Sequence, residues 1–206
     1  MAPHIVSPDS PPQPGDLLFC AGDSFVSYAI RFGQLDGLSH VGVVIDVDGD
    51  EIVLLEALAA GVVENRRRID GLVGYLVRPG NEQMGDSVAT AARRLATQDI
   101  SYSWSTIGWH AGRLLRTSAT RWLGFTIPLG AALQWATQRR AALPDHMICS
   151  EFALSSLCAG LALYQYRTND TAQHLGGRLI PVATQPHWQA SPIDLFRSLA
   201  GRREKR

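Results

Sequence analysis

The sequence contains few cysteines and no excess of charge of either sign. Its 206 residues include 3 cysteines, 19 basic and 19 acidic side chains, so the formal net charge at neutral pH is zero. Three cysteines without CxxC spacing argue against a disulfide framework or a zinc knot and favour a reducing compartment. A neutral chain has no overall field that attracts polyanions, and we therefore expect no nucleic-acid partner.

Motifs for metal and nucleotide chemistry are also missing. The chain has no HExxH pair, no glycine-rich phosphate loop and no spaced set of metal ligands. We therefore expect neither a metal nor a cofactor in its chemistry.

A long uninterrupted hydrophobic run is absent as well. The apolar stretch at residues 122–135 is shorter than a bilayer span, and Pro128 interrupts it. It favours a buried or partly exposed helical insertion. The alternative is a lipid-facing surface helix that makes peripheral membrane contact.

The N-terminal residues lack the features of a Sec signal peptide. Residues 1–14 are rich in proline and serine and have no basic region followed by an apolar stretch. We expect a disordered leader at 1–14, one domain at 15–200 and a basic tail at 201–206. The expected location is the cytoplasm, or a site reached by export without a Sec signal. A signal already removed by processing remains an alternative.

Strand signals fill the first part of the chain and helix signals the second. Short apolar and β-branched runs predict strands at residues 16–20, 40–45, 52–57, 61–64 and 72–77. Helical composition predicts helices at 24–31, 86–97, 104–116, 129–140 and 149–158, and one after residue 191. Asp86 or Ser87 is the expected cap of the second helix, and Gly160 the expected end of the fifth. This order predicts an α+β fold with an antiparallel sheet covered by helices on one face.

Cys149 is the candidate nucleophile because it stands at the predicted start of a helix. Unpaired N–H groups and the helix dipole favour an anion there, which lowers a thiol pKa and assists a developing oxyanion. The alternative is that Cys149 is a small core residue among Ile148, Phe152 and Ala153. Two further cysteines, one in an apolar strand and one inside the helix, are expected to be structural: Cys20 and Cys158.

His40 and Glu56 are the candidate partners of this thiol. His40 opens a predicted strand, and Glu56 ends the apolar run of the next one, where an unpaired carboxylate is costly to bury. An imidazole across the hairpin is the partner that this carboxylate needs. In a thiol triad the carboxylate orients the imidazole, which takes the thiol proton, and the thiolate attacks a carbonyl.

The turn of the hairpin decides whether the two side chains can meet. A two-residue turn at Asp48-Gly49 would set His40 opposite Ala57 and leave Glu56 on the other face. A three-residue turn at 47–49 would set His40 directly opposite Glu56. Both turns fit the sequence, so the pairing requires the three-residue turn or an equivalent bulge.

Several short motifs resemble the permuted branch of the NlpC/P60 superfamily, in particular the permuted papain-like amidases of the YiiX and YaeF type. They are Pro14–Phe19 (PGDLLF), Ser39–Val44 (SHVGVV), Leu55–Ala57 (LEA), Ile148–Phe152 (ICSEF) and Ser191–Leu195 (SPIDL). The resemblance extends from about residue 15 to residue 195. It implies a circularly permuted papain-like fold, an antiparallel sheet or partial barrel packed against helices, with a helical insertion near 104–143.

The same resemblance implies that Cys149 is the nucleophile, His40 the base and Glu56 the third polar member. The expected activity is hydrolysis of an amide bond, in a peptide or cell-wall peptide, through an acyl-thioenzyme. Because the superfamily includes lecithin:retinol acyltransferase-like enzymes, a lipid acylhydrolase or acyltransferase is the first alternative. A non-catalytic ligand-binding module on the same fold is the second.

Overall fold

The structure is a computed structural model that describes residues 4–6, 10–21, 38–58, 60–98, 101–102, 146–168 and 192–200. The expected helices at 24–31, 104–116 and 129–140, the apolar stretch at 122–135, the tail at 201–206 and part of the leader lie outside these residues. No helix in the described ranges has the length and apolar character needed to cross a membrane.

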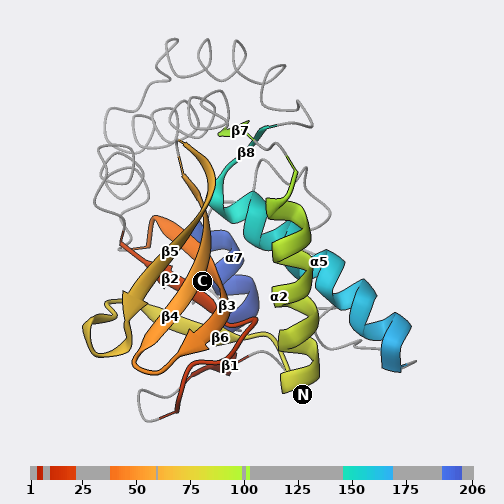
Figure 1. Cartoon of the computed structure of the whole chain (residues 1–206), viewed down its shortest axis with the longest axis horizontal. Helices are drawn as coiled ribbons and strands as arrows, with labels where there is room; N and C mark the ends of the chain where they lie inside the picture. Colours follow the sequence, from red (N-terminus) through yellow and green to blue (C-terminus); the bar gives the residue numbers. More distant parts are fainter. Residues whose placement is uncertain are drawn as a thin grey trace, which may run out of the picture.

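Six strands form one antiparallel sheet in the spatial order β1-β6-β2-β3-β4-β5. They are β1 (His4–Ile5), β2 (Leu17–Cys20), β3 (His40–Asp48), β4 (Glu51–Leu58), β5 (Gly61–Arg68) and β6 (Tyr75–Arg78). A 3-10 turn, η1 (Ile69–Gly71), follows β5. A separate parallel pair joins β7 (Ser101–Tyr102) to β8 (His146–Met147). Figure 1 shows the sheet in colours from red (β1 and β2) through orange to yellow (β6).

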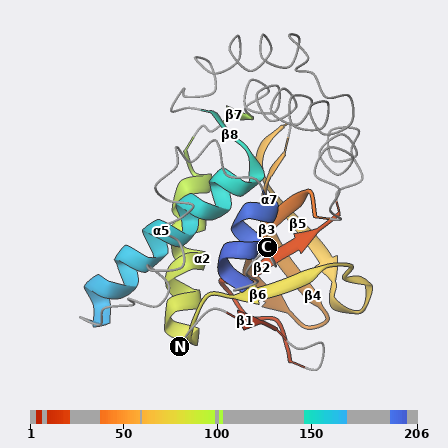
Figure 2. The same ribbon diagram turned by 180° about the vertical axis from the view of Figure 1, so that it is seen from behind.

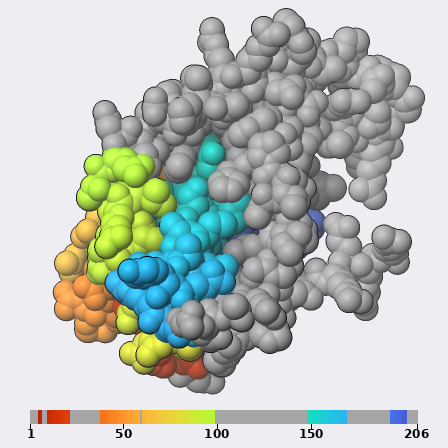
Figure 3. Space-filling model, turned by 90° about the vertical axis from the view of Figure 1, so that its right-hand side faces the viewer, coloured from red at the N-terminus to blue at the C-terminus, as the bar shows by residue number. Residues whose placement is uncertain are grey.

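Three helices cover one face of the large sheet: α2 (Glu82–Ala96), α5 (Cys149–Thr168) and α7 (Pro192–Ala200). Alternate residues of the strands, such as Val41 and Val43, face these helices in the main core. A smaller cluster on the opposite face contains Leu18, Val44 and Leu54. Helix α7 lies behind the sheet in Figure 1 and in front of it in Figure 2, while α2 and α5 lie side by side (Figure 3). The expected α+β class is therefore confirmed.

Helix α2 begins earlier than the sequence predicts. Its cap is Asn81, whose side chain accepts a 2.9 Å hydrogen bond from the Met84 N–H, and neither Asp86 nor Ser87 caps it. Gly85, just before the predicted start at residue 86, lies inside the helix. A Cβ there would lie 2.4 Å from the Pro14 carbonyl oxygen, so this glycine allows a close approach of two backbones.

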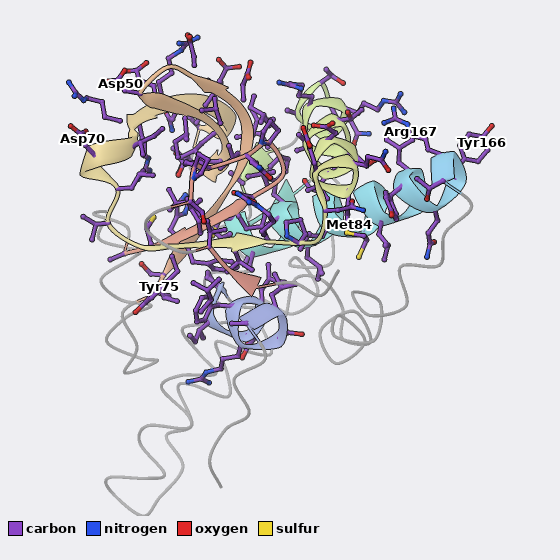
Figure 4. The ribbon with its side chains drawn as sticks, turned by 90° about the horizontal axis from the view of Figure 1, so that it is seen from below. Asp50, Asp70, Tyr75, Met84, Tyr166 and Arg167 are labelled. Atoms are coloured by element: carbon purple, nitrogen blue, oxygen red, sulfur yellow. The ribbon has the colours of Figure 1, made fainter. Side chains whose placement is uncertain are left out.

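The sequence predicts that helix α5 ends at Gly160, but the helix continues to Thr168. Gly160 is buried against α2, and a Cβ on it would lie 2.5 Å from Val88 Cα. The glycine therefore brings two helices together and does not stop one. Beyond it the helix extends into solvent, where Tyr166, 88% exposed, and Arg167 project from its end (Figure 4).

The basic run Arg66–Arg68 belongs to a strand. It lies in β5, which pairs with β4 along its whole length. Arg66 reaches Asp48 at 3.0 Å, and Arg68 reaches Asp70 at 3.0 Å, near the exposed hairpin end labelled in Figure 4. These partners allow a strongly basic run to remain extended.

Candidate active site

The β3–β4 hairpin has a two-residue turn and a bulge. Gly49, with φ of 61°, and Asp50 form the turn between β3 and β4, so neither of the two predicted turns occurs. The ladder then shifts register between Val44 and Asp46. This is the kind of bulge that the pairing of His40 with Glu56 requires when the three-residue turn is absent.

The bulge places His40 and Glu56 on one face. Continued without a shift, the ladder next to the turn would set residue 43 opposite Glu56, and His40, three residues away, would face the other side. Beyond the bulge Val43 pairs with Leu55, so Gly42 comes opposite Glu56. His40 is two residues further and therefore shares the face of Glu56 as its diagonal neighbour.

The imidazole of His40 and the carboxylate of Glu56 are in direct contact. His40 Nε2 lies 2.8 Å from Glu56 Oε1, and the two residues are 8% and 0% exposed. Gly42 provides the space for this contact, since a Cβ on it would lie 3.0 Å from Glu56 Cγ. A buried carboxylate thus has the histidine partner that the sequence predicted.

Two residues of β5, not singled out by the sequence, complete the surroundings of this carboxylate. Asn65 Nδ2 donates to Glu56 Oε2 at 2.7 Å, and Arg67 donates from one terminal nitrogen to Oε1 at 2.9 Å and Oε2 at 3.2 Å. Their signal in the sequence is the alternation along β5. Glu56 pairs with Val63, and residues 65 and 67 follow on the same face.

Cys149 is the first residue of α5 and contacts the same imidazole. Its side chain forms a hydrogen bond with that of His40, and the backbone N–H groups of Val41 and Ser150 donate to the sulfur. Since His40 Nε2 is engaged by Glu56, Nδ1 is the ring nitrogen left to face the thiol. The residue is 4% exposed, so protein groups rather than water surround its charge.

The pKa directions describe a thiolate–imidazolium pair. Burial opposes ionisation of Cys149, but the positive charge of His40, its hydrogen bond and two backbone donors lower the thiol pKa. Burial likewise lowers the pKa of His40, but the Cys149 thiolate and Glu56 outweigh it and raise the pKa. Burial of Glu56 is outweighed by His40, Asn65 and Arg67, which lower its pKa to about 2.

A second carboxyl supports the helix that carries the thiol. Glu151, the third residue of α5, accepts a hydrogen bond from the backbone N–H of Ile148, the residue before the helix. Its Oε2 is buried and has no hydrogen-bond partner. Burial raises the pKa of Glu151 to about 7. Glu151 therefore stabilises the start of α5 with a carboxyl whose pKa lies near neutrality.

The other two cysteines lack this environment. Cys20 is buried at the end of β2, opposite His40 in the ladder, and burial raises its pKa. Cys158 is partly buried within α5, and burial raises its pKa also. Cys149 is thus the cysteine at which the described surroundings favour a thiolate.

The predicted site residues therefore lie together: Cys149, His40 and Glu56 form a continuous chain of contacts. In such a chain the thiolate is a nucleophile, the imidazolium a proton donor to a leaving group, and the carboxylate the group that fixes the ring. Within the described residues, no group of three or more His, Cys, Asp or Glu side chains is arranged to hold a metal ion. No family model, curated protein or solved structure matches the chain.

Proposed function

We propose that this chain is a cysteine hydrolase that cleaves an amide bond through an acyl-thioenzyme, on a circularly permuted papain-like fold. The observation that carries the proposal is the buried contact chain in which His40 joins the Cys149 thiol to the Glu56 carboxylate. A structural cysteine needs neither a charged partner nor backbone donors at its sulfur.

The chemistry follows from these contacts. The Cys149 thiolate attacks the amide carbon, and the carbonyl oxygen becomes an oxyanion at the start of α5, where N–H groups lack helical partners. His40 gives its proton to the amine as the C–N bond breaks. Water then attacks the thioester with neutral His40 as base, the C–S bond breaks, and the acid leaves.

The chain order supports a permuted papain-like arrangement. A papain-type site combines a cysteine at a helix start with a histidine on a facing strand, and here the histidine of β3 precedes the cysteine of α5. The motifs at 14–19, 39–44 and 148–152, which resemble those of the permuted papain-like amidases, also support the proposal.

The proposed substrate is a peptide or cell-wall peptide. The case for a lipid substrate, or for peripheral membrane contact, depends on the apolar stretch at 122–135, which lies outside the described residues. Amide hydrolysis is therefore proposed first, and the product analysis described below distinguishes it from lipid acyl transfer.

The first experiment measures iodoacetamide alkylation at each cysteine across pH, in the wild type and in His40→Ala. Alkylation of Cys149 should be fast well below the ordinary thiol pKa and should slow by at least about tenfold in His40→Ala at pH 6. Cys158 is the internal control whose rate should not depend on His40, and Cys20, whose pKa is raised by burial, should stay slow in both proteins. Equal, slow rates at all three cysteines would refute the catalytic assignment and favour a binding module.

A second experiment identifies the acyl donor. The wild type and Cys149→Ser are incubated with peptidoglycan fragments and, separately, with phospholipid vesicles, and the products are analysed by mass spectrometry. Release of amines from the peptide substrates by the wild type alone supports the proposal. Release of fatty acid or an acylated Cys149 with the vesicles alone would replace the amidase with a lipid acylhydrolase or acyltransferase.

A further inference from the structure

Two cationic side chains share one oxygen of the buried carboxylate. Glu56 Oε1 contacts His40 Nε2 at 2.8 Å and accepts from a terminal nitrogen of Arg67 at 2.9 Å. Those two nitrogens therefore lie within about 6 Å of each other, close enough for one charge to change the pKa of the other group. A histidine side chain can give up its proton during a reaction, whereas an arginine side chain remains a cation.

The charges of the site balance in the resting state. Along the contact chain they alternate between positive and negative, in the order Arg67, Glu56, His40, Cys149. Acylation removes the charge on the sulfur. The imidazole must then be neutral to accept a proton from water, which leaves Glu56 without its imidazolium partner. An uncompensated charge is unfavourable at this fully buried position.

We propose that Arg67 is a positioning residue that allows His40 to become a neutral base in the second half of the reaction, because it keeps Glu56 paired when the imidazolium loses its proton. This inference rests on the proposed hydrolase function. In the step concerned, His40 takes a proton from water, the water oxygen bonds to the acyl carbon, and the C–S bond breaks. The sulfur leaves as thiolate beside the newly formed imidazolium, which restores the resting pair.

The placement of Arg67 in β5 distinguishes it from its neighbours. Arg66 and Arg68 bind exposed carboxylates such as Asp48 and Asp70, and their side chains are 54% and 63% exposed. Arg67 is 40% exposed and reaches a carboxylate whose side chain is 1% exposed. Of these three arginines, it is the one whose charge reaches a buried group.

The charged and titratable groups around His40 come from four elements. The Cys149 thiolate on α5 and Glu56 on β4 raise the pKa of His40, against the effect of burial. Cys20 on β2 is its ladder neighbour, and burial keeps that thiol protonated by raising its pKa. Arg67 on β5 is a like charge behind Glu56, so it favours the neutral imidazole.

The direction in which the pKa of His40 shifts when Arg67 is lost distinguishes the proposal from a merely structural role. If Arg67 only held Glu56 in place, its loss would weaken the contact with His40 and lower the pKa of the imidazole. If Arg67 is the counter-charge, its loss leaves the buried pair with a net negative charge once the proton departs, so the pKa rises. The two roles predict opposite shifts.

The experiment is an NMR titration of the His40 ring in full-length Cys149→Ala, in which the thiolate is absent as it is after acylation. Adding Arg67→Gln should raise the pKa of His40 by roughly one unit. The matched control Arg66→Gln, on the same strand but directed to exposed partners, should change it by less than about a third of that. His40→Asn identifies the resonance. A fall, or no change, in Arg67→Gln would overturn the proposal.

Two further variants test the same point without depending on Arg67→Gln alone. Arg67→Lys keeps a charge beside Glu56 and should leave the pKa of His40 near its value in Cys149→Ala. Asn65→Ala removes a neutral donor from the same carboxylate and should not raise it. A rise in Asn65→Ala as large as in Arg67→Gln would show that a loosened carboxylate causes the shift, and would also overturn the proposal.

The titration requires no substrate, so its result is independent of the hydrolase assignment. Slow alkylation of Cys149 would refute the proposed function and leave the measured sign of the Arg67 effect unchanged. An absent or reversed shift alongside fast, His40-dependent alkylation would refute the role of Arg67 alone.

Discussion

The imidazole of His40 and the carboxylate of Glu56 meet at 2.8 Å on one face of the sheet, although the ladder next to their hairpin turn would place them on opposite faces. One bulge, between Val44 and Asp46, reverses that relation. The catalytic interpretation therefore depends on a local irregularity of β3. The same interpretation depends on Gly42, whose lack of a side chain leaves room for the Glu56 carboxylate.

Gly42→Ala should weaken the site while the fold remains intact. The added Cβ would lie 3.0 Å from Glu56 Cγ and 3.4 Å from Oε1, so the Glu56 side chain must shift by a few tenths of an ångström, which disturbs its contact with His40. Because small displacements of catalytic groups are costly, we expect the alkylation rate of Cys149 at pH 6 to fall by about tenfold.

The control for this variant is Gly71→Ala, because a Cβ at Gly71 meets nothing within 4 Å. Both proteins are compared by circular dichroism and by alkylation followed with mass spectrometry. A Gly42→Ala protein that alkylates at the wild-type rate would show that the tight fit against Glu56 does not position the triad.

Gly160→Ala should destabilise the protein through the contact between two helices. The new methyl group would lie 2.5 Å from Val88 Cα and 2.8 Å from its backbone nitrogen, and main chain cannot turn aside as a flexible side chain can. Overpacking of this kind costs about 1–3 kcal/mol, which outweighs the gain of an alanine within a helix. Urea unfolding measures the loss, again with Gly71→Ala as reference. An unchanged or increased stability would mean that α2 and α5 separate easily.

The strand pattern, and the contacts among the three candidate side chains, could be predicted from the sequence because they depend on local chemistry. Short apolar and β-branched runs predicted β2, β3 and β4, and a carboxylate ending an apolar run required a partner, which led from Glu56 to His40. A cysteine at a helix start similarly identified Cys149. The predictions of the permuted fold and of the activity are not tested by these elements.

What the sequence did not predict depends on tertiary contacts. A bulge has no characteristic composition, so the register shift between Val44 and Asp46 could not be predicted. The turn at 49–50 differs from both predicted turns. Gly160 was predicted to end a helix, but it lies within α5, where the backbone of Val88 packs against it, as that of Pro14 does against Gly85. Arg67 was hidden in a basic run, since only the pairing of β5 with β4 shows that its side chain reaches Glu56.

Stability should fall as pH rises from 5 to 8, because of Glu151. Burial raises the pKa of its folded-state carboxyl from an ordinary value of 4.5 to about 7. A raised pKa means that the folded protein holds this proton more tightly than the unfolded chain. The stabilisation is therefore complete below pH 4.5 and is lost as pH rises through 7, by up to about 3 kcal/mol.

Glu151→Gln removes the proton but keeps a carbonyl oxygen to accept the Ile148 N–H. The difference in unfolding free energy between wild type and variant should thus shrink or reverse between pH 5 and pH 8, measured by urea denaturation. Glu56→Gln is the control of opposite sign. The pKa of Glu56 is lowered to about 2, so its contribution is present above pH 4.5 and is lost only as pH falls towards 2. Parallel curves for wild type and Glu151→Gln from pH 5 to 8 would show that Glu151 ionises in the folded protein as it does in water.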